Sequence, residues 1–327
     1  MANISRLIDW TLKNSAKISL KVTKLGWISE WLVGHFDYQV AIKWEGVIYR
    51  GRGIDAEEPL AFGKAVAEAF ERFAMTGFDN PWATAAYLDY EVAATRAYFE
   101  LVGIDRALCH HYCKTRFTKR DFSILPERFQ LQKLKKTLEK NNLEAGLFEL
   151  RPVLDAKICT MMVWHKDPKH KIRGFVNGYG CASDIDAASA SAAYECLRTA
   201  AAVYVGGARP DKPLEVLNQP GNAWYHFWAT QSDECMDYFK NNLYPVDSFV
   251  PQLFAEPLSR KDVSIERIST LDRDFPTIPL VIAQAKSDKF IKPQFGPFQP
   301  NESTIKRLTE FCGHLVDPDV LVPHFYG

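Results

Sequence analysis

The sequence predicts a mixed fold of the α/β or α+β class, in which a strand or turn followed by a helix is repeated within the chain. Three observations predict it. A glycine-containing turn and an alanine-rich helix occur more than once, strand-like runs lie between and after these helices, and 47% of the 327 residues are hydrophobic. That composition is enough to bury a sizeable core as one large domain or two tightly packed halves.

The repeat is the strongest internal signal. One copy, GRGIDAEEPLAFGKAVAEAFERFAM, begins at Gly51, and the other, GYGCASDIDAASASAAYECLRTAAA, begins at Gly178. The two copies share glycine, alanine and glutamate at the same offset: Gly51/Gly178, Gly53/Gly180, Ala61/Ala188, Ala65/Ala192 and Glu68/Glu195. A fainter third copy keeps the Ala, Ala, Glu spacing at Ala93, Ala97 and Glu100.

The spacing indicates how each helix packs. Alanines four residues apart form one small-residue stripe, which lets another backbone approach closely, and the glutamate one turn later sits beside that contact. In the first copy the apolar face consists of Ala61, Phe62, Ala65, Val66, Ala69, Phe70 and Phe73. Glu68 and Arg72 fall on its border and Glu71 lies one step further toward solvent, where charged side chains can bind a ligand.

The remaining elements follow from periodicity and turn residues. Strands are expected at AIKWEGVIYR, GLFELRPVLDAKICTMMVWH and IPLVIAQAKS, and an exposed helix in PERFQLQKLKKTLEKNN. From Gly207 the stretch GARPDKPLEVLNQPGN is rich in turn residues, which predicts a surface connection and a candidate sub-boundary near 207–222. Residues 1–40 are expected to form an amphipathic N-terminal segment before a domain at 41–327.

Charge and cysteine content limit the classes of function. The 40 Lys and Arg residues equal the 40 Asp and Glu residues, so no field of the whole protein attracts nucleic acid or a membrane. No apolar stretch reaches the roughly 20 residues of a membrane span, and the N-terminus lacks the apolar region of a signal peptide. The 7 cysteines are scattered, which favours a reducing cytoplasm.

The repeated glutamates are the main candidates for chemistry. Glu68 and Glu71 lie at i,i+3 on one helix, and Glu100 and Glu195 occupy equivalent positions on the others. Converging carboxylates repel one another unless a cation lies between them, and a magnesium ion that bridges carboxylates and phosphates is a common arrangement. In the alternative interpretation each glutamate pairs with a nearby arginine in a structural network. The arginines concerned are Arg72, Arg96 and Arg198. The residues alone leave the two interpretations even.

Other motifs are weaker. GRG and GYG allow a backbone to approach an anion, but neither completes a phosphate-binding series, so a structural turn is favoured. CHHYC at 109–113 has no second Cys or His pair at zinc-finger spacing, and a metal site there is not favoured. Cys181 beside GYG is the one cysteine placement of note.

Four segments, in order, resemble the signatures of the YcaO family. GRGIDAEEPLAFGKAVAEAFERF resembles the first, a Gly-x-Gly followed by a helix with Glu-x-x-Glu-Arg. RAYFELVGIDRALCHHY is similar to the second, and NGYGCASDIDAASASAAYECLRTAAAVYVGGARPD to the third. IPLVIAQAKSDKFIKPQFG resembles the late strand and loop that precede the family's Pro-rich C-terminus. The resemblance covers residues 40 to 327.

The resemblance implies an α+β fold in which antiparallel sheets and packed helices enclose ATP, with carboxylates holding magnesium. It implies transfer of the γ-phosphoryl group to a backbone amide oxygen of a ribosomal peptide. Loss of phosphate then gives an azoline by cyclodehydration, a thioamide with a sulfur donor, or an amidine with an amine. It also implies a peptide substrate and a partner protein that recognises the substrate's leader. A homodimer is expected, because it is the commonest oligomer.

The resemblance also implies site residues. Glu68 and Glu71 match the Glu-x-x-Glu pair, Glu100 the first glutamate of the second signature, and Glu195 the glutamate of the third. The residues expected to act in catalysis are Glu68, Glu71, Glu195 and Arg198. Those expected to bind the cofactors are Glu68, Glu71, Arg72, Glu100, Asp105 and Glu195. Magnesium is expected at Glu68, Glu71 and Glu100.

The chain departs from the family pattern at several positions. Lys64 stands where the first signature usually has Ser, and Gly103 and Ile104 replace the Glu-Arg of the second. Asp105 and Asp89 are candidate substitute carboxylates. The chain also ends in VPHFYG instead of a Pro-x-Pro-x-Pro run. These changes keep a second hypothesis open, a catalytically silent YcaO-like scaffold or a peptide-binding subunit of a modification complex.

Overall fold

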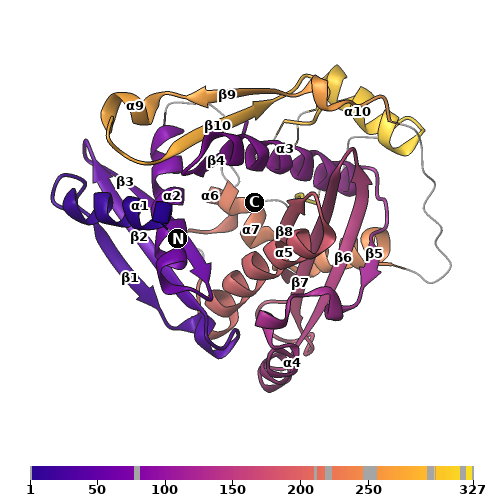
Figure 1. Ribbon diagram of the computed structural model, residues 1–327. Coiled ribbons are helices and arrows are strands. Elements are labelled where there is room, and N and C mark those ends of the chain that lie inside the picture. Colours follow the sequence, from indigo (N-terminus) through magenta and orange to yellow (C-terminus); the bar gives the residue numbers. More distant parts are fainter. Residues whose placement is uncertain are drawn as a thin grey trace.

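The structure is a computed structural model. It describes residues 2–76, 82–209, 212–217, 223–245, 256–292, 298, 300–316 and 322–325. In these residues three sheets are surrounded by helices (Figure 1). Every strand pair is antiparallel, which confirms the predicted α+β class.

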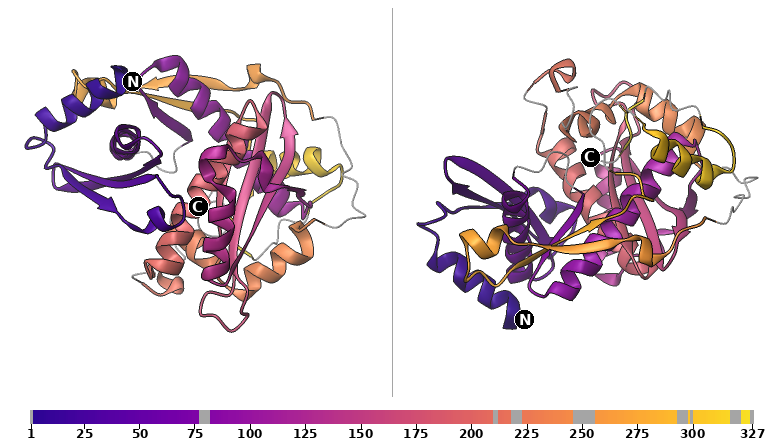
Figure 2. Two further views of the ribbon diagram at one scale, coloured as in Figure 1. Left: turned by 60° about the horizontal axis from the view of Figure 1, so that its bottom comes forward. Right: turned by 90° about the horizontal axis from the view of Figure 1, so that it is seen from above.

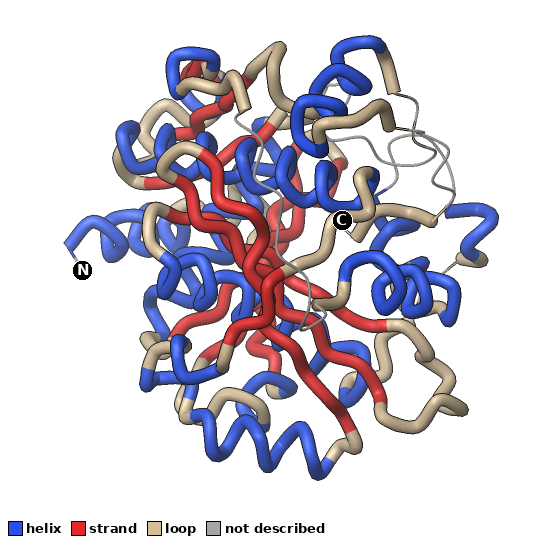
Figure 3. Tube along the Cα trace, turned by 90° about the vertical axis from the view of Figure 1, so that its right-hand side faces the viewer, coloured by secondary structure: helices blue, strands red, loops and turns tan. Residues whose placement is uncertain are grey.

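The strands form sheets A, B and C. Sheet A has the order β1 (Lys21–Leu25), β2 (Phe36–Trp44), β3 (Val47–Asp55). Sheet B has the order β4 (Ala83–Tyr87), β10 (Val281–Lys286), β9 (Ser264–Ile268). Sheet C has the order β5 (Thr118–Arg120), β6 (Leu143–Val153), β7 (Ala156–His165), β8 (Phe175–Ala182). Figure 3 shows the strands running through the middle of the molecule with helices around them.

The α-helices are α1 (Ala2–Lys13), α2 (Glu58–Ala74), α3 (Tyr90–Tyr112), α4 (Leu131–Lys140), α5 (Ile185–Ala200), α6 (Leu214–Leu217), α7 (Ala223–Ala229), α8 (Asp233–Tyr238), α9 (Thr270–Asp274) and α10 (Glu302–Cys312). Short 3-10 turns occur at Trp27–Glu30, Phe122–Ile124, Glu127–Phe129 and Arg260–Asp262. Single π-helical turns occur at Ala201–Val205 and Phe239–Leu243.

Two of the runs predicted to form strands are instead hairpins. The run GLFELRPVLDAKICTMMVWH contains the end of β6 and all of β7. The run AIKWEGVIYR contains the end of β2, a two-residue turn at Glu45 and Gly46, and the start of β3. Both turn residues have positive φ, 49° and 86°. A two-residue hairpin turn with positive φ at both positions matches the twist of the flanking strands, which explains why a Glu-Gly pair reverses the chain here.

The three copies of the repeat are three β-α units: β3 with α2, β4 with α3, and β8 with α5. Their helices begin after acidic residues at corresponding positions, Glu57, Asp89 and Asp184. The side chains of Asp89 and Asp184 accept hydrogen bonds from the backbone amides of the first turn. Such caps satisfy amides that have no partner within the helix.

Glycine brings strand and helix into backbone contact in two of these units. A Cβ atom at Gly51 would overlap the carbonyl oxygen of Ala65 on α2, and one at Gly178 would overlap that of Ala192 on α5. The alanine stripe therefore packs directly on the glycine strand, as the small-residue spacing predicts. Figure 2 shows α2 against sheet A and α5 against sheet C, which these contacts hold in place.

α3 lies between sheets B and C and connects the units. Ala97 and Leu101 of α3 are fully buried. They share one apolar core with Ala283 of β10 and Phe148 of β6. Glu100 comes from this helix, so the core fixes its backbone relative to both sheets.

Residues 2–40 are packed into the same fold. Leu7 of α1 is buried in one apolar cluster with Phe70 of α2, and β1 pairs with β2. The boundary predicted at residue 40 falls within β2, while much of the candidate boundary near 207–222 lies outside the described residues. None of the helices in the described part of the chain is both long and apolar enough to cross a membrane.

Candidate active site

Two repeat units hold their glutamates in the same way. The backbone amide of Arg52 on β3 donates to Oε2 of Glu68 on α2 at 2.8 Å. The backbone amide of Tyr179 on β8 donates to Oε2 of Glu195 on α5, also at 2.8 Å. Each amide directly follows the first glycine of its Gly-x-Gly, where strand and helix are closest. The two glutamates therefore make the same contact with the strand of their unit.

The third unit places Glu100 of α3 beside β4. The backbone amide of Thr84 faces the Glu100 carboxylate, at the same separation along the chain as in the other two units. Glu71 of α2 also reaches this strand: its Oε2 accepts from the amide of Ala86 at 2.9 Å, and its Oε1 from Thr84 Oγ1 at 3.4 Å. β4, the strand of the third unit, therefore positions one glutamate from α2 and one from α3.

The four carboxylates influence one another. Burial and, to a smaller extent, the neighbouring Glu68 carboxylate raise the pKa of Glu71 to about 7, against the lowering effect of the Ala86 amide. Burial raises the pKa of Glu100 well above its ordinary value, and Glu71 and Glu195 add to this. We call these four residues, Glu68, Glu71, Glu100 and Glu195, the glutamate cluster.

Glu195 interacts with both Glu100 and Glu68. Burial raises its pKa, Arg198 and the amide of Tyr179 lower it, and Glu68 raises it. Every member of the glutamate cluster therefore interacts with two others, in the order 68, 71, 100, 195 and back to 68. All four side chains are half-buried, so each keeps some access to solvent.

Few cations of the protein balance these charges. Arg72 Nη2 lies 2.7 Å from Glu68 Oε1, and its side chain is 57% exposed. Arg96 instead lies over the ring of Tyr87, 4.5 Å from its centroid. Among the described residues, no salt bridge includes Glu71, Glu100 or Glu195. Within the described residues a salt bridge supports the structural-network alternative for Glu68, and Arg198 lowers the pKa of Glu195 without a salt bridge.

Two arginines join the unit of β3 and α2 to the unit of β8 and α5. Arg52 binds Asp37 through Nε–Oδ1 at 3.0 Å, and its Nη2 approaches the carbonyl of Arg198 at 3.5 Å. Arg198 Nη1 donates in turn to the carbonyl of Arg52 at 3.4 Å. This exchange holds β3 next to α5 and keeps the Arg198 guanidinium close to Glu195.

Asp105 does not join the glutamate cluster. Its carboxylate is fully buried and accepts from Arg307 Nε at 3.0 Å, from Arg307 Nη2 at 2.7 Å and from the amide of Ile291 at 2.9 Å. It lies five residues after Glu100 on α3, which turns it to another side of the helix. We therefore leave Asp105 out of the proposed cofactor site. Asp89 serves as a helix cap.

The other residues that depart from the family pattern make contacts within the fold. Lys64 pairs with Asp55 at 2.7 Å. Ile104 is buried in the core, and a Cβ atom at Gly103 would lie 3.1 Å from Cβ of Cys181 on β8. A glutamate at position 103 would therefore need Cys181 to move. In the CHHYC segment, His110 Nδ1 pairs with the carbonyl of Thr115 at 2.9 Å.

The donor set of the glutamate cluster fits a hard cation. Carboxylate oxygens are the ligands that magnesium prefers. In the described part of the chain, no three His, Cys, Asp or Glu side chains are placed to hold one ion by themselves. Magnesium is usually bound by one or two carboxylates together with water and substrate phosphates, so the separation of these glutamates suits a magnesium–phosphate complex better than an ion held by protein alone.

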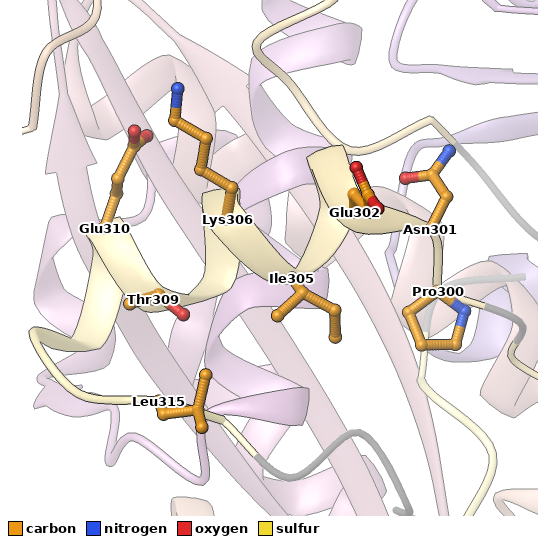
Figure 4. A pocket seen from close by; sticks show the side chains of 8 residues that line it. All are labelled: Pro300, Asn301, Glu302, Ile305, Lys306, Thr309, Glu310 and Leu315. Atoms are coloured by element: carbon orange, nitrogen blue, oxygen red, sulfur yellow. The ribbon is translucent and has the colours of Figure 1, made fainter.

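The sequence interpretation missed β4 and its amides. Ala83, Thr84 and Ala85 stand at the positions of the Gly-x-Gly in the other two units. The separation of these residues from Glu100 along the chain was the signal for this strand, but alanine replaces both glycines of the Gly-x-Gly. Figure 4 shows a separate pocket along α10, lined by Ile305, Lys306 and Leu315, which includes no residue of the glutamate cluster.

No protein-family model and no curated protein sequence matches the chain. Solved structures do match it in fold. YcaO from Methanopyrus kandleri bound with AMPPCP and Mg²⁺ is similar with a TM-score of 0.60 and 12% identity, over 91% of this chain and 95% of that one. A subunit of the E. coli microcin synthetase McbBCD complex is similar with a TM-score of 0.57 and 10% identity, over 89% of this chain and 95% of that one.

A heterocyclase in complex with substrate and cofactor is similar with a TM-score of 0.62 and 12% identity. The match covers 88% of this chain and 52% of the heterocyclase, so this chain spans about half of that protein's length. At these identities the likeness concerns the fold. The chain has the fold of the YcaO proteins, which confirms the fold that the sequence resemblance implied.

Proposed function

We propose that this protein uses Mg-ATP to activate a backbone amide of a peptide during modification of a ribosomal peptide. The observation that carries the proposal is the glutamate cluster. Three β-α units of a YcaO fold bring four carboxylates together, and three of them have no ion pair with a cation of the described chain. Similar folds in YcaO bound with AMPPCP and Mg²⁺, and in a heterocyclase with substrate and cofactor, support it.

Magnesium would be held by one or two carboxylates at a time from Glu68, Glu71 and Glu100, together with phosphate oxygens. Arg72 and Arg198 would neutralise phosphate charge, and Glu195 would position the Arg198 guanidinium. When bound, Mg-ATP would supply the phosphoryl group that makes the amide oxygen a leaving group. The protein's contribution is positioning and charge neutralisation, because phosphoryl transfer needs little covalent help from side chains. The raised pKa values of Glu71 and Glu100 mean that a bound cation would stabilise the ionised form of each carboxylate and would release any proton that it carries.

The product would depend on the nucleophile. A Cys, Ser or Thr side chain gives an azoline by cyclodehydration, a sulfur donor gives a thioamide, and an amine gives an amidine. We further propose that a partner protein recognises the leader of the peptide substrate and that the chain forms a homodimer. The similarity to a subunit of the McbBCD complex supports action within an assembly.

Calorimetric titration with Mg²⁺ and a non-hydrolysable ATP analogue tests the cofactor step. We expect binding that requires both components and weakens by about tenfold or more in Glu68→Gln and Glu71→Gln, since each substitution removes a charged ligand. Glu234→Gln, at an exposed site on α8, is the matched control and should bind as the wild type does. Absence of binding, alone and with a candidate partner present, would contradict the enzyme and leave the scaffold hypothesis.

A further inference from the structure

Two thiols from different elements meet at the end of α3. Cys113 directly follows the last residue of α3, and Cys312 is the last residue of α10. The Cys113 Sγ donates to the carbonyl oxygen of Leu308 at 3.5 Å. In an α-helix that carbonyl faces the amide four residues later, which here is the amide of Cys312. Cys113 therefore lies against the last turn of α10, and its thiol is hydrogen-bonded to the thiol of Cys312.

Packing between α3 and α10 fixes this contact. Figure 1 shows the two helices next to each other. Phe311, which precedes Cys312, packs against His110 of α3 with 5.2 Å between the ring centroids. Further back along α10, Arg307 pairs with Asp105 of α3 at 2.7 Å. The two thiols are therefore neighbours because the helices that carry them are packed together on both sides of the contact.

The two thiols differ in acidity. The hydrogen bond from Cys113, together with the backbone at His314, lowers the pKa of Cys312 to about 6, although burial acts against this. As a thiol, Cys312 donates to the carbonyl oxygen of His314 at 3.1 Å. The hydrogen bond to Cys312 and burial raise the pKa of Cys113. At neutral pH the pair therefore holds a thiolate at Cys312 and a thiol at Cys113 that donates to it.

The other cysteines lack this combination. All 7 cysteines lie in the described part of the chain and are free. Burial raises the pKa of each of the others, which are Cys109, Cys159, Cys181, Cys196 and Cys235. Cys312 is 9% exposed, and the two residues after it, Gly313 and His314, are exposed, so a small molecule can approach from the end of α10. A low pKa, some access and an adjacent second thiol are the features of cysteines that react reversibly with oxidants.

We propose that Cys113 and Cys312 are a modification site, at which hydrogen peroxide forms an intrachain disulfide between α3 and α10. The Cys312 thiolate attacks one oxygen of the peroxide and the O–O bond breaks. The sulfur gives up two electrons and becomes a sulfenic acid, and the released hydroxide takes a proton from solvent and leaves as water. The Cys113 sulfur then attacks the sulfenic sulfur, the S–O bond breaks, and the hydroxyl group leaves with the Cys113 proton as a second water. A thiol reductant reverses the bond by exchange.

Oxidation of the purified full chain with hydrogen peroxide tests the proposal. After unfolding, a maleimide should label two fewer cysteines than the 7 of the reduced chain. Peptide mapping by mass spectrometry should find one cross-linked pair, which contains Cys113 and Cys312, and dithiothreitol should restore full labelling. The oxidised chain should also melt about 5 °C higher, because the bond closes a long loop in the unfolded chain.

Two variants separate this site from general oxidation. Cys312→Ser lacks the attacking thiolate, so it should form no cross-link and should consume peroxide at least about tenfold more slowly. Cys181→Ser is the matched control, because Cys181 is half-buried like Cys113, and it should form the cross-link as the wild type does. Circular dichroism checks that both variants are folded, and the mapping of the wild-type chain does not depend on either.

Three results would overturn the proposal. These are unchanged labelling of all 7 cysteines after oxidation, a cross-link that uses Cys109 in place of Cys113, and accumulation of sulfinic acid at Cys312 without a cross-link. Since no nucleotide is present in the assay and neither thiol belongs to the glutamate cluster, none of these outcomes depends on the ATP site.

Discussion

Two groups of buried charge share helix α3 and differ in how they are balanced. Glu100 belongs to the glutamate cluster, and Asp105, five residues later, belongs to a cluster rich in arginine. We call the second group the arginine cluster. Its members are Asp105, Arg106, Arg151, Glu256 and Arg307.

In the arginine cluster every acidic side chain is paired. Glu256 lies 2.9 Å from Arg106 and 2.7 Å from Arg307, and Asp105 lies 2.7 Å from Arg307. These side chains are 7% exposed or less. Burying a charge is costly unless it is paired and hydrogen-bonded, so this cluster is consistent with a structural role.

In the glutamate cluster only Glu68 has a salt bridge within the described residues, with Arg72. Burial and mutual repulsion raise the pKa of Glu71 and Glu100 instead. The same helix thus satisfies one buried acid completely and leaves another dependent on protons or on a cation from outside. This difference is the physical reason for placing a ligand at the glutamate cluster and not at Asp105.

Removing one acid from the arginine cluster should have the largest effect. In Asp105→Ala, Arg307 loses two hydrogen bonds while remaining buried, and we expect a loss of about 3–5 kcal/mol in the free energy of unfolding. Urea denaturation at neutral pH measures it. A loss below about 1 kcal/mol would contradict the structural role of this cluster and erase the contrast with the glutamate cluster.

Removing the charge of one acid from the glutamate cluster should change the free energy of unfolding in the opposite direction and stabilise the protein. The pKa of Glu71 rises from 4.5 to about 7 on folding, so its contribution favours the folded state below pH 4.5 and is lost as the pH rises to 7. Above pH 7 the ionised group costs on the order of 2–3 kcal/mol in the ligand-free protein. Glu71→Gln stays neutral and can still accept from Ala86, so it should be more stable by about that amount at pH 8.

Urea denaturation from pH 4.5 to 8 checks this prediction, with Glu234→Gln as the control. The Glu71→Gln variant should show a shallower fall in stability, with some slope left because Glu100 also has a raised pKa. A variant less stable than the wild type at pH 8 would show that the Glu71 carboxylate is already balanced.

Magnesium binding should depend on pH in the same window. A carboxylate must lose its proton to bind a metal, so the dissociation constant of Mg²⁺ with the ATP analogue should rise by up to about tenfold, or 1.4 kcal/mol, per pH unit below pH 7. Titrations at pH 8 and pH 6 measure it. Affinity that stays constant across this range would place the metal away from Glu71.

The helices and the equivalence of Glu68 and Glu195 were predictable, because the alanine stripe and the Gly-x-Gly turn are local patterns. The partner of Asp105 was not, since Arg307 lies 202 residues away and nothing local pairs them. β4 was missed because Ala83 and Ala85 replace the two glycines of the Gly-x-Gly. The one remaining sign of this strand in the sequence is its separation from Glu100 along the chain. The hairpin at Glu45 and Gly46 was missed because Glu-Gly is a weak turn signal.

The smallest effect on stability is expected at Arg72, and it separates a structural ion pair from a ligand contact. Arg72 and Glu68 form an i,i+4 pair whose side chains are 57% and 28% exposed, so Arg72→Ala should cost less than about 1 kcal/mol of folding free energy. If Arg72 neutralises phosphate charge, the same variant should weaken binding of the Mg–ATP analogue by about tenfold, because a charge-assisted contact is lost. Denaturation and calorimetry on one sample measure both. Weakened stability with unchanged nucleotide affinity would show that Arg72 serves only as the structural ion-pair partner of Glu68.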